Sequence, residues 1–158
     1  MALSMHGDNS VLFRKYVEGR EKAVFPWSLS IVDCFFISSA FLELEGAESV
    51  KLLRVSDGGN QAETSTIANA YDLYEMDTEA GGVEVVLLHE TSGSLCYWDV
   101  HERFVVAVGG RAFLGAARPY PVDIERHRYV EAMLHLAENG GGELPEVVYD
   151  ALSTDSAG

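Results

Sequence analysis

Four short apolar segments lie close together in the second half of the chain, and they constrain the fold more than any other feature. They cover residues 83–89, 95–100, 104–108 and 112–117. Ser92-Gly93-Ser94 and Gly109-Gly110 mark turns between them. Strands joined by only two to five residues pair antiparallel, because a parallel pair needs a longer crossover. The sequence therefore predicts an antiparallel β-meander over about residues 83–117, and residues 50–55 could extend it as a further strand.

Amphipathic helices are predicted on both sides of this meander in the sequence. In residues 9–24, Leu12 and Tyr16 fall near one helical face, and Pro26 is expected to end this helix. Residues 122–138 keep their apolar side chains on one face, and residues 144–152 follow as a final short element. The expected class is α+β, with N-terminal and C-terminal amphipathic helices packed on one face of the antiparallel sheet.

Two segments are left open by the pattern. Residues 27–44 contain β-branched and aromatic side chains that suit a buried strand, but the apolar residues also recur at helical spacing. In either case the segment belongs to the core. Residues 61–77 carry only a thin apolar stripe, which predicts a short surface helix or a loop.

The size and composition indicate one folded unit. The chain has 158 residues and is 47% hydrophobic, which is enough to bury a core in a single domain over residues 1–158. We expect residues 1–8 and 153–158 to be disordered, as chain ends usually are.

Negative charge is the strongest indication of function. The chain has 25 Asp and Glu against 11 Lys and Arg, a formal net charge of −14, and no Lys or Arg occurs between Arg54 and Arg103. We call the ten acidic residues of that interval the carboxylate block. They are Asp57, Glu63, Asp72, Glu75, Asp77, Glu79, Glu84, Glu90, Asp99 and Glu102. Such a surface repels phosphate backbones and anionic lipids, so nucleic acid and membranes are not expected partners, whereas a basic protein is.

Aromatic residues accompany these acids. A Tyr or Trp among carboxylates can anchor an arginine of a partner by stacking and hydrogen bonding. The expected partner-binding residues combine both types: Asp72, Tyr74, Glu75, Asp77, Glu79, Glu90, Trp98, Asp99 and Glu102.

No catalytic or cofactor motif is present. The sequence contains no GxSxG, HExxH, CxxC, GxGxxG or GxxxxGK[ST] pattern, so we assign no catalytic, metal-binding or cofactor-binding residues and expect no cofactor. Cys34 and Cys96 are expected to be buried thiols in a reducing cytoplasm. The preference for Arg over Lys, eight to three, fits a bacterial source.

These features favour a non-enzymatic acidic protein that captures and neutralises a basic partner. An immunity or antitoxin-like inhibitor of a toxin such as a nuclease would have this character. One alternative is a small metal- or ligand-binding enzyme that uses the region of His89, Asp99 and His101. Another is a subunit of a larger assembly that exposes part of its apolar surface. The candidate residues for that surface are Trp27, Phe35, Phe36 and Phe41.

Overall fold

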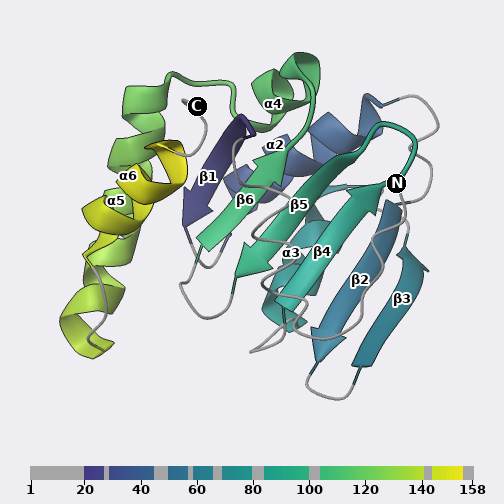
Figure 1. Ribbon diagram of the computed structural model, residues 1–158, viewed down its shortest axis with the longest axis horizontal. Helices are drawn as coiled ribbons and strands as arrows, with labels where there is room; N and C mark the ends of the chain where they lie inside the picture. The colour runs from purple at the N-terminus through teal and green to yellow at the C-terminus, as the bar shows by residue number, and fades with distance from the viewer. Residues whose placement is uncertain are drawn as a thin grey trace.

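A single six-stranded antiparallel sheet organises the molecule (Figure 1). In this computed structural model the described residues are 20–26, 29–44, 50–56, 59–65, 69–79, 84–99, 104–140 and 144–154. The strand order is β1-β6-β5-β4-β2-β3, and every neighbouring pair is antiparallel. The strands are β1 (Lys22–Pro26), β2 (Val50–Ser56), β3 (Gly59–Ser65), β4 (Glu84–His89), β5 (Ser94–Asp99) and β6 (Phe104–Val108). The expected α+β class with an antiparallel meander is confirmed.

Helices cover both faces of this sheet. They are α2 (Ile31–Leu42), α3 (Ala70–Glu79), α4 (Arg111–Ala117), α5 (Val122–Gly140) and α6 (Pro145–Thr154). On one face, side chains of α2, α3 and α4 share a core with Val85, Cys96 and Trp98 of the sheet. On the other face, α5 and α6 pack through Tyr129 and Tyr149 against the alternate residues of the same strands. We expected the N-terminal and C-terminal helices to share one face: α5 and α6 do lie on the same face, whereas most of the predicted N-terminal helix lies outside the described residues.

The central strands follow their sequence pattern closely. β4, β5 and β6 lie within one residue of the predicted segments, and residues 50–55 do extend the sheet, as β2. β4 and β5 are joined by a tight turn in which Gly93 adopts a φ of 74°, a left-handed conformation that glycine accepts without steric cost. Side chains of β5 and β6 are buried throughout, because helices cover both faces.

The last predicted strand, residues 112–117, is instead the helix α4. Phe113, Leu114 and Ala117 are its buried residues, and their spacing of one and four residues is helical. Gly110 is the N-cap of this helix, so Gly109-Gly110 ends the sheet at β6 and does not form a hairpin. The alanine-rich composition also favours a helix.

The N-terminal segment was predicted incorrectly where it can be compared. Residues 22–24, the end of the predicted helix, belong to the strand β1, which pairs with β6 along its whole length. Pro26 ends a strand and not a helix, and proline is tolerated there because β1 is an edge strand. Residues 9–19 of that predicted helix lie outside the described residues, as do residues 1–8 and 155–158. Ser153 and Thr154, which we expected to be disordered, complete α6.

The two open segments are now assigned. Within residues 27–44 the chain forms the helix α2, which begins where the Ser30 side chain accepts a hydrogen bond from the Asp33 backbone N–H at 3.1 Å. The expected helix is present at residues 70–77, as part of α3, but residues 61–65 belong to the strand β3, where we expected a helix or a loop. α3 is capped by Asn69, whose Oδ1 accepts from the backbone N–H groups of Tyr71 and Asp72 at 2.9 and 3.2 Å.

Candidate protein-binding face

The helix α3 carries acidic and aromatic side chains on its solvent side. Leu73 and Met76 are buried in the core, and the intervening turns place Tyr71, Tyr74 and Glu75 in solvent. Tyr71 is the most exposed of the large hydrophobic residues in the described part of the chain, at 70%. The sequence of α3, AYDLYEMDTE, contains no basic residue. Its outer surface therefore offers phenol rings and a carboxylate to a cation.

Three of the nine expected binding residues, Asp77, Trp98 and Asp99, are buried and therefore do not belong to this surface. The Trp98 side chain is fully buried, and its indole Nε1 donates a 2.7 Å hydrogen bond to Asp77 Oδ1. This bond satisfies both buried polar groups and ties α3 to β5. Asp99 is also fully buried, and the Tyr97 hydroxyl donates to its Oδ2 at 3.2 Å. These side chains hold the fold together and cannot touch a docked protein.

The other expected residues are distributed as follows. Tyr74 and Glu75 are exposed on α3, Asp72 beside them is half-buried, and Glu90 is exposed in the turn between β4 and β5. The side chain of Glu79 and the whole of Glu102 lie outside the described residues. The structure thus gathers Asp72, Tyr74 and Glu75 on one helix, and adds Tyr71, which was not among the expected residues.

A second exposed stripe lies next to α3, on α2. Four large apolar side chains project from its outer side: Ile31, Val32, Phe35 and Leu42. Of the aromatic residues considered for an assembly surface, Phe35 is 58% exposed, Phe36 is half-buried, Phe41 is buried, and Trp27 lies outside the described residues. Both sides of α2 are apolar, which is why the sequence alone did not separate the core side from the outer side.

The one charged residue of α2 points away from this stripe. Asp33 is buried, and Arg128 Nη2 of α5 donates to its Oδ1 at 2.8 Å. Arg128 also donates to the hydroxyl of Tyr120, and its guanidinium lies 4.7 Å from the centre of that ring. Burial raises the pKa of Tyr120 to about 12, and the Asp33 carboxylate acts in the same direction. Between Ile31 and Leu42 the outer side of α2 therefore carries no charge, and the exposed carboxylate of the C-cap Glu43 follows directly after Leu42.

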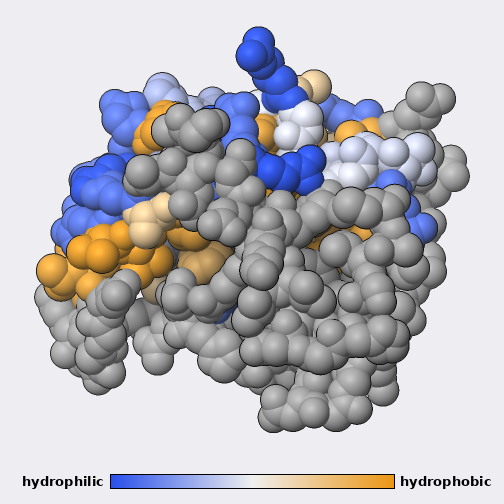
Figure 2. Space-filling view, viewed as in Figure 1, coloured by the Kyte–Doolittle hydropathy of each residue, from blue (hydrophilic) through white to orange (hydrophobic). Residues whose placement is uncertain are grey.

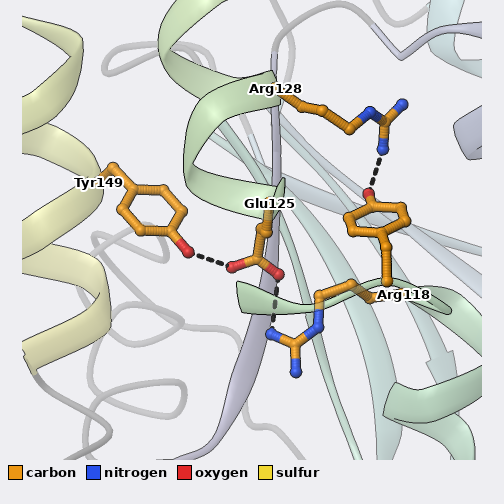
Figure 3. Close-up of polar contacts among 5 residues, drawn as sticks. Arg118, Glu125, Arg128 and Tyr149 are labelled. Atoms are coloured by element: carbon orange, nitrogen blue, oxygen red, sulfur yellow. Dashed lines mark hydrogen bonds and ion pairs between the residues drawn. The ribbon is translucent and has the colours of Figure 1, made fainter. Parts of the chain in front are cut away.

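Arginines near the C-terminal helices are paired with acids outside the carboxylate block. Figure 3 shows one of these pairs, in which Arg118 and Tyr149 both contact Glu125. Arg118 donates to Glu125 Oε2 at 2.8 Å, and the Tyr149 hydroxyl donates to Oε1 of the same carboxylate at 2.6 Å. Burial and this carboxylate raise the pKa of Tyr149. Arg126 pairs with Asp150 on the surface at 3.0 Å. These cations neutralise residues of α2, α5 and α6, so they do not offset the acids of α3.

Two of the residues considered for an enzyme, His89 and Asp99, do not lie close together. His89 pairs with Ser94 at one end of β5, and Asp99 lies at the other end, about 17 Å away at ordinary strand spacing. The His89 ring is held by Ser92 Oγ at 2.7 Å, and His101 lies outside the described residues. Within the part of the chain that is described, no group of three His, Cys, Asp or Glu side chains could hold a metal ion.

The two cysteines are buried in the same core and are not bonded to each other. Burial raises the pKa of Cys34 to about 12, and the Asp77 and Asp33 carboxylates add to that effect. Burial likewise raises the pKa of Cys96 well above its ordinary value. Both thiols are therefore protonated at neutral pH, which makes them poor nucleophiles. The expectation of two buried thiols is confirmed.

No protein-family model, curated protein or solved structure matches this chain. Among the described helices, none has the length and apolar character required to cross a lipid bilayer.

Proposed function

We propose that this protein is a non-enzymatic acidic binding protein that captures and neutralises a basic protein partner through α3. The observation that carries this proposal is the outer side of α3, where Tyr71, Tyr74 and Glu75 are exposed on a helix without a basic residue. An arginine of the partner can stack on a phenol ring and pair with the neighbouring carboxylate.

The net charge of −14 supports the same proposal, because it steers a cationic protein toward the surface before contact. A small acidic protein with such a helix suits the role of an immunity or antitoxin-like inhibitor. Its α3 would occupy the cationic cleft of a toxin such as a nuclease. We place the protein in the cytoplasm, where two free thiols remain reduced.

The test is capture of a basic protein from a lysate of the source organism, followed by affinity measurement with the purified partner. Glu75→Lys should weaken binding at least tenfold, because it replaces the exposed carboxylate on the outer side of α3 with a cation. Glu131→Lys is the matched control, since Glu131 is exposed on α5, on the opposite face of the sheet, and the change in charge is identical. It should change affinity less than about threefold.

Salt provides a second measurement. Binding of the wild-type protein should weaken steeply between about 0.1 M and about 1 M salt, where the screening length falls from about 10 to about 3 Å. Equal affinities of the two charge-reversal variants, or a salt-independent affinity, would refute the proposed role of α3.

A further inference from the structure

Exposed aromatic rings are concentrated on α3. Among the described residues they belong to Phe35, Tyr71 and Tyr74, and both tyrosines lie on this helix. Tyr71 is 70% exposed and Tyr74 is 42% exposed, so a partner can reach both phenol rings. The core requires neither ring, because Leu73 and Met76 supply the buried side of the same helix. Aromatic side chains that stay exposed in this way are typical of protein contact surfaces.

A carboxylate completes this group. Tyr74 follows Tyr71 by three residues and Glu75 follows it by four, so the three side chains occupy neighbouring positions on the helix surface. Side chains of a helix lean toward its N-terminus, which brings Tyr74 and Glu75 toward the Tyr71 ring. The helix carries no basic residue, and the ion pairs among the described residues do not include Glu75. In the described part of the chain, the group therefore offers two rings and an anion but no cation.

The same chemistry occurs in complete form elsewhere in the fold. The guanidinium of Arg128 lies 4.7 Å from the centre of the Tyr120 ring and donates at 2.8 Å to the Asp33 carboxylate. One arginine thus contacts a ring and an anion at once, which its planar, delocalised guanidinium permits. A lysine ammonium is a compact and strongly hydrated charge, so it replaces these two contacts poorly. α3 presents the rings and the anion of this arrangement, and the arginine has to come from outside.

Exposed acids on the other helices lie in a different setting. Over α5 and α6, where Figure 2 shows an apolar patch, Asp150 is exposed but pairs with Arg126 at 3.0 Å. The exposed hydrophobic side chains described on these two helices are aliphatic, so no exposed ring accompanies that pair. On α2, Phe35 is exposed, but the exposed Glu43 lies eight positions further along, about 12 Å at helical rise. Among the described helices, exposed rings and an exposed carboxylate therefore occupy neighbouring positions only on α3.

We infer that α3 selects arginine over lysine in its partner, and that Tyr71 and Tyr74 determine this selectivity. The guanidinium stacks on a phenol ring while its N–H groups donate to the Glu75 carboxylate. The partner is then a basic protein whose contact segment presents arginine. This selectivity rests on the proposed function of α3 and deepens it, because charge alone attracts both cations and the rings distinguish between them.

The test is an NMR titration of the full isotopically labelled chain with two flexible peptides of the same length. One peptide alternates glycine with arginine and the other alternates glycine with lysine, so both carry the same charge and are steered equally. Both should shift the backbone amide signals of α3. At about 0.15 M salt the arginine peptide should bind at least about threefold more tightly, as expected for an exposed cation–π contact.

Ring variants identify the source of the selectivity. Tyr71→Ala/Tyr74→Ala should make the two affinities equal, whereas Tyr71→Phe/Tyr74→Phe should keep the preference, because the ring and not the hydroxyl stacks on the guanidinium. Phe35→Ala is the matched control, since it removes a ring of intermediate exposure, 58%, from the neighbouring helix, and it should leave the preference unchanged. Circular dichroism confirms that the variants are folded, and Tyr71→Ala replaces the double alanine variant if that variant is not.

The outcomes separate the selectivity from the proposed function. Equal affinities of the wild type for the two peptides overturn the selectivity, and so does a preference that survives the loss of both rings. Glu75→Lys should weaken binding of both peptides. If it does so while the wild type shows no preference, the selectivity fails and the acidic role of α3 stands. If neither peptide shifts the amide signals of α3, the proposed role of this helix fails together with the selectivity.

Discussion

The two buried thiols make the stability of the fold sensitive to alkaline pH. The ordinary pKa of a cysteine is 9.0, whereas burial raises the pKa of Cys34 to about 12 and that of Cys96 well above the ordinary value. Above pH 9 the unfolded chain ionises both thiols and the folded chain does not. Because both folded pKa values are raised, their contribution is fully present below pH 9 and is lost as the pH rises toward the folded values.

The size of this loss of stability depends only on how far the thiols ionise in the unfolded chain, provided that their pKa values in the folded chain lie above the pH of measurement. At pH 10, one unit above the ordinary pKa, ionisation stabilises the unfolded chain by about 1.4 kcal/mol per thiol. The two together contribute about 3 kcal/mol, a large share of the roughly 5–15 kcal/mol that holds a typical domain folded. Tyr120 and Tyr149 add less than about 1 kcal/mol in total at this pH, because a free phenol is only half ionised there.

The assay is urea unfolding at pH 7.5 and pH 10 under reducing conditions, for the wild type and for Cys34→Ala/Cys96→Ala. The wild type should lose at least about 3 kcal/mol between the two pH values, and the double variant should lose about 3 kcal/mol less than the wild type. Each protein is compared with itself at the two pH values, so the destabilisation caused by the cavities that the alanines leave cancels. Equal losses in the two proteins would show that the thiols ionise in the folded state, which would contradict their burial.

Two glycines and two ion pairs give further tests by urea unfolding. Gly109→Ala should destabilise the protein by about 1–3 kcal/mol, because the added Cβ would lie 2.5 Å from the Phe113 ring. Gly115 is an exposed residue of α4 with open space around it, so Gly115→Ala should stabilise the protein by up to about 1 kcal/mol. An opposite order would contradict the packing around Gly109. Glu125→Ala should cost about 3–5 kcal/mol, because it leaves the Arg118 guanidinium without its partner in a largely buried position. Asp150→Ala removes an exposed ion pair and should leave the urea midpoint unchanged, so a large loss there would refute its assignment as a surface pair.

The sequence predicted the central sheet well because its signals there are local. β4, β5 and β6 are continuous apolar runs bounded by glycine and serine, and their short connections determine antiparallel pairing. α5 was predictable for the same reason, since its apolar residues recur along a single face.

The errors came from features that only long-range contacts decide. Residues 112–117 follow a Gly-Gly pair that reads as a hairpin, but Phe113 and Leu114 find their core beside α2, which requires a helix. β1 is a short apolar run directly after charged residues, and the residues of β6 with which it pairs are 78 to 86 positions further along the chain. A local pattern carries no information on such a partner.

The candidate site was predicted only in part for a related reason. Burial divides one acidic segment into two groups: Asp77 and Asp99 satisfy buried partners, while Glu75 reaches solvent. The hydrogen bond between Asp77 and Trp98 spans 21 residues, and no local spacing indicates it. The apolar stripe of α2 was equally hidden, because its only acid is paired with Arg128, 95 residues further along the chain.

The link between Asp33 and Arg128 joins two layers that the sheet keeps apart. α2 and α5 cover opposite faces, so the contact passes around the outer edge of β1. Separating either helix from the sheet exposes a buried carboxylate on one side or frees a guanidinium on the other, so neither layer can open alone at low cost. The edge strand β1 is itself buried along its whole length, which denies a template to any unfolded chain that could otherwise add to it and seed aggregation.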